Sequence, residues 1–216
     1  MRVRLQPIFL ANVLLFIKKD DTVRDFPFVS KNCQVAMLTL KVNPAAFSNS
    51  PHEILKFFPN INTMVVEHTT EFEETDTLPD TVTALVVGCL SFALLTEQHL
   101  RYADRVVEVQ SCFSNDGHPA DFTLFPNLER LTLDGVPDHF TLPKHKLKHL
   151  TIFYDGFGND PLAIFPAECA EQIVFVFFSL TKFFEAKAKQ LPPNVHIFCS
   201  GIGEGVRPED FFPWWS

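Results

Sequence analysis

Two histidines, His145 and His149, are the residues whose type and spacing come closest to a metal site. They are four positions apart, a spacing that brings two imidazoles onto one ion only when both lie on a helix. Here they cross a proline-containing turn and a predicted strand, with Lys144, Lys146 and Lys148 interleaved. Because neighbouring ammonium groups repel a cation, the pattern favours a small solvated basic patch, with metal ligation as the minor alternative.

Other stretches with the composition of a site do not have its context. The glycine-rich "GIGEG" at 201–205 follows a predicted strand, but no helix follows whose amides would hold a phosphate, so we expect a turn. The acidic "EFEETD" at 71–76 is typical of a solvated loop. No serine or cysteine lies in a recognisable nucleophile motif. We therefore expect a non-enzymatic protein without catalytic residues, cofactor or metal; an enzyme within a variant α/β fold is the alternative.

The composition indicates a folded protein without a broad basic surface. Of 216 residues, 46% are apolar and 20% are charged, which suffices for a substantial core. The net charge of -8 and the pI near 5.4 disfavour nucleic acid and anionic membranes as partners. The apolar "PIFLANVLLFI" after Arg2 and Arg4 imitates a secretory signal, but Pro7, Asn12 and the following "KKDD" indicate a helix of the mature protein.

The cysteines and the long apolar run at 84–95 indicate in which cellular compartment the protein is expected. Five cysteines without a C-x-x-C pair indicate free thiols in a reducing environment. The run "ALVVGCLSFALL", from Ala84 to Leu95, is shorter than the roughly 18 residues that cross a bilayer. We expect a soluble protein of the cytoplasm, with the nucleus as the alternative, and neither nucleic acid nor membrane as a partner.

A recurring pattern of apolar residues organises most of the chain and would position any site. Seven windows contain an apolar-polar-apolar core, and six follow a proline in "FPN", "LPD", "LPK", "FPA" or "LPPN". Such a proline is typical of a turn that leads into a short strand. Successive windows are about 22 residues apart, within the range of about 20 to 29 for leucine-rich repeats. Their central residues are Met64, Leu85, Val107, Leu131, Leu150, Ile173 and Val195.

Two windows, "LERLTL" at 128–133 and "LKHLTI" at 147–152, match the first half of the pattern L-x-x-L-x-L-x-x-N-x-L. Over roughly residues 50–205 the chain resembles the leucine-rich-repeat family. The resemblance implies an α/β solenoid with parallel strands on a concave face and short helices on a convex face. Leu131 should then face the core and Thr132 the solvent. A conventional α/β domain is the alternative.

The second half of the repeat departs from the family. None of the seven windows has the family's asparagine, which implies a variant class with a less regular convex side. The 24 phenylalanines can fill the interior in place of leucine. Between the strands, "SPHEILKFF", "FALLTEQHLRYA" and "FFSLTKFFEAKAKQL" have the composition of short helices.

Residues 1–48 do not carry the repeat, and their pattern predicts three helices. The first contains "PIFLANVLLFIKK", with Pro7 in its first turn. The second begins with Asp21 as its cap and breaks at Pro27. The third runs from about Val29 to Leu40. Its apolar face consists of Val29, Cys33, Ala36, Met37 and Leu40.

These helices resemble the F-box, a compact module that often precedes leucine-rich repeats. The resemblance rests on the first helix and on "VSK" at 29–31, while the stretched "LQP" opening and Cys33 depart from the family's pattern. It implies docking on the adaptor of a cullin-type ubiquitin ligase. The alternative is that the helices only cap the first repeat. The residues expected to dock are Leu5, Leu10, Val13, Ile17 and Val29.

Residues between the core positions of each strand should point to the concave face, because side chains alternate across a strand. A face with apolar ends and a charged centre suits a protein or peptide ligand. The alternative is that the valines and phenylalanines of this face are present only because these residue types are favoured in β-strands. The candidate protein-binding residues are Glu67, Glu108, Gln110, Arg130, Thr132, Asp134, His149, Thr151, Phe153 and His196.

The sequence thus predicts three regions. Residues 1–48 form the F-box-like or capping module, residues 49–205 a leucine-rich-repeat solenoid of about seven repeats, and residues 206–216 an aromatic tail. We expect the rings of the tail to cover the final repeat, with a docking peptide as the alternative. The predicted function is a protein-protein interaction scaffold that, by resemblance, is a substrate receptor of a ubiquitin ligase.

Overall fold

The computed structural model describes residues 5–47, 49–68, 71–72, 76–97, 99–113, 118–136, 139–154, 164–177 and 191–199. The chain divides into two compact units, Met1–Gly88 and Cys89–Trp215. The division falls inside a strand, whereas the sequence pattern changes near residue 48. Among the described residues, no helix combines the length and the apolar character that crossing a bilayer requires.

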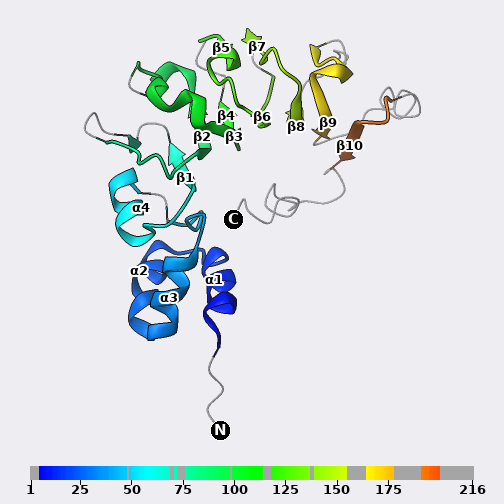
Figure 1. Ribbon diagram of the computed structural model, residues 1–216. Coiled ribbons are helices and arrows are strands. Elements are labelled where there is room, and N and C mark those ends of the chain that lie inside the picture. The colour runs from blue at the N-terminus through cyan, green and yellow to red at the C-terminus, as the bar shows by residue number, and fades with distance from the viewer. Residues whose placement is uncertain are drawn as a thin grey trace. The chain divides into compact units, whose positions relative to one another are not determined.

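The first unit begins with three helices, α1 (Pro7–Leu15), α2 (Asp20–Val29) and α3 (Lys31–Thr39) (Figure 1). Pro7 lies in the first turn of α1, as predicted, where its missing N–H costs no helical hydrogen bond. Ser30 caps α3, and its Oγ accepts a hydrogen bond from the Cys33 amide at 3.2 Å. Helix α3 packs against both other helices. Its buried face consists of Cys33, Ala36, Met37 and the following Leu40.

Helix α2 differs from the prediction at both ends. The cap position holds Lys19, and Asp21 lies inside the first turn. Pro27 does not break the helix, which continues to Val29. Because a proline in the last turn removes a single helical hydrogen bond, its cost stays local. Val29 therefore ends α2 and is 75% exposed, so it does not belong to the buried face of α3.

A fourth helix, α4 (Pro51–Phe57), connects these helices to the first strand, β1 (Thr63–His68). It confirms the helix predicted from "SPHEILKFF". Ser50 is its cap, and its Oγ accepts from the Glu53 amide at 3.5 Å. Ile54 and Phe58 are fully buried, which anchors the helix in the core of the first unit.

The remaining strands form a mostly parallel sheet, which confirms the α/β class. Hydrogen bonds join its strands in the order β1-β2-β3-β6-β8-β9-β10, and β4 pairs with β2. Every strand pair from β3 onward along this order is parallel. The members beyond β1 are β2 (Ala84–Ser91), β3 (Val106–Val109), β4 (Cys112–Phe113), β6 (Arg130–Asp134), β8 (Leu147–Tyr154), β9 (Ala170–Phe177) and β10 (Val195–Cys199).

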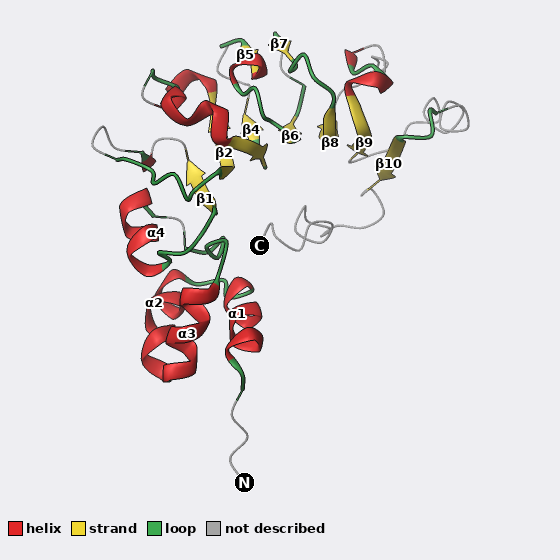
Figure 2. Cartoon of the chain, viewed as in Figure 1, coloured by secondary structure: helices red, strands yellow, loops and turns green. Residues whose placement is uncertain are grey.

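Short 3-10 helices precede or follow several strands (Figure 2). The segment predicted as helical from "FALLTEQHLRYA" forms η2 (Phe92–Leu94) and η3 (His99–Arg105) rather than an α-helix. Two further ones are η4 (Phe122–Leu124) and η5 (Ala167–Cys169). A separate parallel pair joins β5 (Ala120–Asp121) to β7 (Phe140–Thr141). The helix predicted from "FFSLTKFFEAKAKQL" lies almost entirely outside the described residues.

We call each strand window with its preceding turn a rung. The predicted centres of rungs four to seven are register partners: Leu131 pairs with Leu150, and Ile173 with both Leu150 and Val195. Leu131 is 1% exposed and Thr132 is partly exposed, as predicted from the alternation.

The third rung is displaced from its predicted register. Val109, not Val107, pairs with Leu131. Val109 is fully buried, whereas Val107 is partly exposed. This is the one predicted window without a preceding proline, so no turn signal indicated where its strand begins. Since the shift is two residues, outward side chains stay outward, but Glu108 now lies beside Arg130.

One further rung, which was not predicted, precedes β1. Val42 forms a parallel bridge with Thr63, and the Lys41 carbonyl accepts from the Asn62 and Thr63 amides at 2.9 and 3.0 Å. The Asn62 carbonyl accepts in the same way from two amides of the next rung. Asn43 then lies in register with Met64, at the core position that an apolar residue holds in the other rungs, and because Asn43 is polar the sequence pattern did not reveal this rung.

The two "FPN" motifs have a common structural role. Phe58 and Phe125 are buried at 0% and 1% exposure. The asparagine that follows each proline donates to a backbone carbonyl in the preceding helical segment: Asn60 to Leu38 of α3 at 2.8 Å and Asn127 to Asp104 of η3 at 2.7 Å. The motif therefore supplies a core ring, a turn and a hydrogen bond to the segment before the neighbouring strand.

Candidate functional site

The first candidate surface lies on the N-terminal helices. Nine of the twelve strongly exposed large apolar side chains in the described part of the chain fall between residues 5 and 38. Isolated exposed apolar residues are normal on a protein surface, but a concentration of this kind marks an interaction site. We call the nine the helical apolar residues: Leu5, Ile8, Phe9, Val13, Phe16, Phe28, Val29, Val35 and Leu38.

Helix α1 and its C-cap residue, Phe16, carry four of them on one face. Ile8, Phe9, Val13 and Phe16 are 51% to 75% exposed, and their spacing places them together on a helix of 3.6 residues per turn. Ala11 and Leu14 are buried on the other side of the helix. Apolar side chains thus occupy both faces of the helix, and among the described residues only the face with Ala11 and Leu14 is covered.

The other helices contribute at the junction of α2 and α3. Phe28 and Val29 end α2 at 83% and 75% exposure. The side-chain amide of Asn32 donates to the Leu5 carbonyl at 2.8 Å, which holds the segment before α1 against the start of α3. The exposed side chain of Leu5 is thereby fixed close to this junction.

The five predicted docking residues differ in how exposed their side chains are. Leu5, Val13 and Val29 are each more than half exposed, whereas Leu10 and Ile17 are partly exposed. Sequence reasoning missed Ile8, Phe9, Phe16 and Phe28. A signal was present for the first three, because a short helix with apolar residues on both faces requires cover on more than one side.

The second candidate surface is the outward side of the sheet in the second unit. The register aligns Glu108, Arg130, His149 and Gln172 in one row across four strands. A guanidinium nitrogen of Arg130 lies 3.3 Å from Oε2 of Glu108, and Gln110 donates to Oε1 of the same carboxylate at 3.1 Å. Arg130 keeps 51% of its side chain exposed, so its guanidinium can contact a ligand.

Asp134 lies at the other end of β6 from this row. Its carboxylate accepts a hydrogen bond from the Ser111 hydroxyl. Burial raises the pKa of Asp134 above its ordinary value, and the Ser111 hydrogen bond opposes the rise. The raised pKa shows that desolvation outweighs the hydrogen bond at this carboxylate.

Two predicted ligand contacts, Thr151 and Phe153, are buried at 8% and 5% exposure. Both belong to β8, which has a hydrogen-bonded strand on either side. Side chains of the neighbouring strands therefore cover them. Thr132 is partly exposed and His196 exposed. Glu67 is exposed on β1 in the first unit.

The two candidate metal ligands have separate surroundings. A ring nitrogen of His145 donates to the Leu128 carbonyl at 2.6 Å, which ties the turn to the preceding rung. Lys148, between the two histidines, pairs with Glu129 at 2.7 Å. In the part of the chain that the structure describes, no three histidine, cysteine or acidic side chains gather as a metal-binding group.

Two other features from the sequence lie wholly outside the described residues, namely "GIGEG" and the aromatic tail. The acidic run at 71–76 is described only in part. Burial raises the pKa of its first carboxyl group, Glu71.

No family model, characterised protein or solved structure matches the chain significantly.

Proposed function

We propose that this protein is a non-enzymatic interaction protein that docks a partner through its helical apolar residues. The exposure of these side chains carries the proposal. Complete burial of a valine, leucine or phenylalanine contributes about 1.5 to 3 kcal/mol relative to leaving it in water. A partner that covers several of them together gains enough to offset the cost of association.

The partner that we propose is the adaptor of a cullin-type ubiquitin ligase. The F-box resemblance suggests this adaptor, and the exposure of Leu5, Val13 and Val29 at predicted docking positions supports it. The alternative, in which the helices only cap the sheet, explains the buried faces of the helices. It does not account for Phe16 and Phe28, which are 75% and 83% exposed.

For the remainder of the chain we propose a leucine-rich-repeat arc whose outward strand face holds a second protein or peptide. Parallel pairing, equivalent register partners at each rung and the repeated "FPN" contacts support this arrangement. The ligand would meet Arg130, His149 and Thr132, the exposed or partly exposed residues of the central strands. In this proposal the protein is the substrate receptor of the ligase.

Capture of the purified adaptor by the intact chain tests the docking proposal. We expect wild type to retain the adaptor, and Phe9→Ser with Phe16→Ser to reduce capture at least about tenfold, because both rings are lost from the contact. Arg130→Ala is the matched surface control and should capture like wild type. Failure of the wild-type chain to retain the adaptor would remove this partner. Equal capture by the double variant would remove the helical apolar residues as its site.

A further inference from the structure

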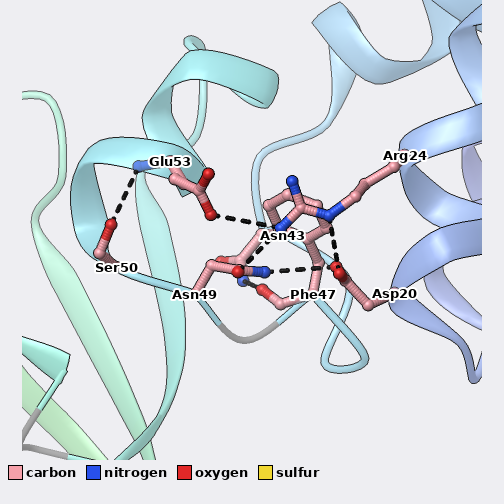
Figure 3. Close-up of polar contacts among 7 residues, drawn as sticks. All are labelled: Asp20, Arg24, Asn43, Phe47, Asn49, Ser50 and Glu53. Carbon is pink, nitrogen blue, oxygen red and sulfur yellow. Dashed lines mark hydrogen bonds and ion pairs between the residues drawn. The ribbon is translucent and has the colours of Figure 1, made fainter.

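Arg24, on α2, joins the N-terminal helices to the chain beyond them (Figure 3). Its Nε lies 2.7 Å from Oδ2 of Asp20 on the same helix. Another guanidinium nitrogen donates to Oδ1 of Asn49 at 2.9 Å and to Oε2 of Glu53, on α4, at 3.2 Å. One side chain therefore bridges α2, the segment before α4 and α4 itself.

Two further kinds of contact complete the cluster. The guanidinium carbon lies 5.0 Å from the ring centroid of Phe47 and 5.6 Å from that of Phe57, within the range of cation-π attraction. Asn49 also donates to the carboxylate of Asp20 at 3.2 Å, so the hydrogen bonds close into a ring. We call Asp20, Arg24, Asn49 and Glu53, with the rings of Phe47 and Phe57, the Arg24 cluster.

The Arg24 cluster has the physical properties of a reversible connection. Arg24, Asp20 and Glu53 are 33%, 38% and 43% exposed at their side chains. Each ion pair at such exposure contributes little by itself, and added salt screens it. The ring faces and Asn49 restrict the guanidinium geometrically, so the contacts act as a set. The connection should therefore weaken with ionic strength while the apolar core of the unit persists.

We propose that the Arg24 cluster is a salt-sensitive latch that fixes α2, and with it α1 and α3, against α4 and the segment that precedes α4. The functional consequence rests on the proposed docking: a partner on the helical apolar residues is then held in a fixed orientation to α4 and β1. With the latch open, the same partner remains bound through α1 but no longer orders α4. Arg24 is thus a positioning residue and not part of the docking surface.

Hydrogen exchange of the intact chain tests the latch. In Arg24→Gln, amides of residues 50–58 should exchange about tenfold faster than in wild type, while those of β8 and β9 are unchanged. Lys56→Gln, which removes a cation from α4 outside the cluster, should exchange like wild type. Raising NaCl from about 0.1 to about 1 M should accelerate the same amides in wild type and have little further effect in Arg24→Gln.

The outcomes separate the latch from the proposed function. Unchanged exchange at 50–58 in Arg24→Gln, or an equal rise in β8 and β9, would overturn the latch. With adaptor added, α4 amides should slow in wild type but not in Arg24→Gln, and slowing in both would overturn the coupling. If no adaptor binds while Arg24→Gln still accelerates α4, the latch stands and the docking proposal fails.

Discussion

The side-chain amide of Asn43 forms hydrogen bonds with both backbone groups of Val65. Its Oδ1 accepts from the Val65 N–H at 2.8 Å, and its Nδ2 donates to the Val65 carbonyl at 2.9 Å. Asn43 is 1% exposed, and Nδ2 also approaches the Phe47 carbonyl at 3.3 Å. A side chain thus continues the backbone hydrogen bonding of β1 at the rung that precedes it.

Replacement of Asn43 by leucine should destabilise the fold, although the other rungs have an apolar residue at this position. The change leaves the backbone groups of Val65 without these partners, at a cost of about 2 to 3 kcal/mol. Urea unfolding of wild type and Asn43→Leu measures it. Asn60→Ala, which loses a single exposed hydrogen bond, is the comparison and should cost about 1 kcal/mol or less. Equal stability of Asn43→Leu and wild type would contradict the assigned role.

Gly88 and Gly135 should respond differently to substitution. A Cβ at Gly88 would lie 3.1 Å from the Glu67 carbonyl oxygen and 3.2 Å from its Cα, and strand backbone cannot swing away. Gly88→Ala should therefore cost about 1 to 3 kcal/mol through overpacking. Gly135 has a φ of 102° and no atom near its Cβ position, so Gly135→Ala costs about 1 kcal/mol through backbone strain.

A second substitution at each glycine distinguishes steric overpacking at Gly88 from backbone strain at Gly135. Asparagine tolerates positive φ better than alanine, so Gly135→Asn should recover part of the stability lost in Gly135→Ala. Gly88→Asn should be at least as unstable as Gly88→Ala, because its Cβ meets the same backbone atoms. Thermal unfolding of the four variants provides the comparison. If Gly88→Asn were more stable than Gly88→Ala, steric contact with β1 would not be the cause of the destabilisation at position 88.

The raised pKa of Asp134 predicts a defined pH dependence. An acid with a higher pKa in the folded than in the unfolded state stabilises the fold when protonated, and this contribution is lost as pH rises through the folded pKa. Asp134→Asn, whose amide oxygen can still accept from Ser111, should be more stable than wild type near neutral pH. The difference should shrink as pH falls from about 7 to about 5. A difference that grew with acidity would contradict the assignment.

Cys169 should be slow to alkylate in the folded protein. Burial, with a contribution from Glu168, raises the pKa of its thiol to about 11 from an ordinary value of 9.0. Since the thiolate is the reactive form, its fraction near neutral pH falls roughly a hundredfold. Mass spectrometry after iodoacetamide treatment should show Cys169 modified much more slowly in the native chain than in urea. Similar rates in both conditions would show that the thiol is neither shielded nor shifted.

The sequence predicted rungs where turn chemistry and apolar spacing agreed. "FPN" before Leu131 specified a buried ring, a turn and a strand, and the register of β6 and β8 followed. Without such a proline, the third centre was placed at Val107 rather than Val109. The rung before β1 was missed because its core position holds Asn43, whose partner, the Val65 backbone, lies 22 residues away. Local patterns do not contain such distant hydrogen bonds.

The candidate surfaces were predicted less completely. Alternation along a strand gives the side on which Thr151 lies, but not whether its neighbours cover it. Likewise, apolar residues on both faces of α1 indicate that cover is needed, but not which face stays exposed among the described residues. In the Arg24 cluster, Arg24 contacts Asn49 and Glu53, which lie 25 and 29 positions further along the chain. No sequence motif indicated these contacts.

The exchange footprint of the purified adaptor on the intact chain tests the central claim most directly. Burial of the helical apolar residues should slow amide exchange in α1 and at the junction of α2 and α3, around Phe9, Phe16 and Phe28, and leave β8 and β9 unchanged. This is the result that the docking proposal predicts. A bound adaptor that protected only the sheet, or that left α1 exchanging as in the free chain, would contradict it.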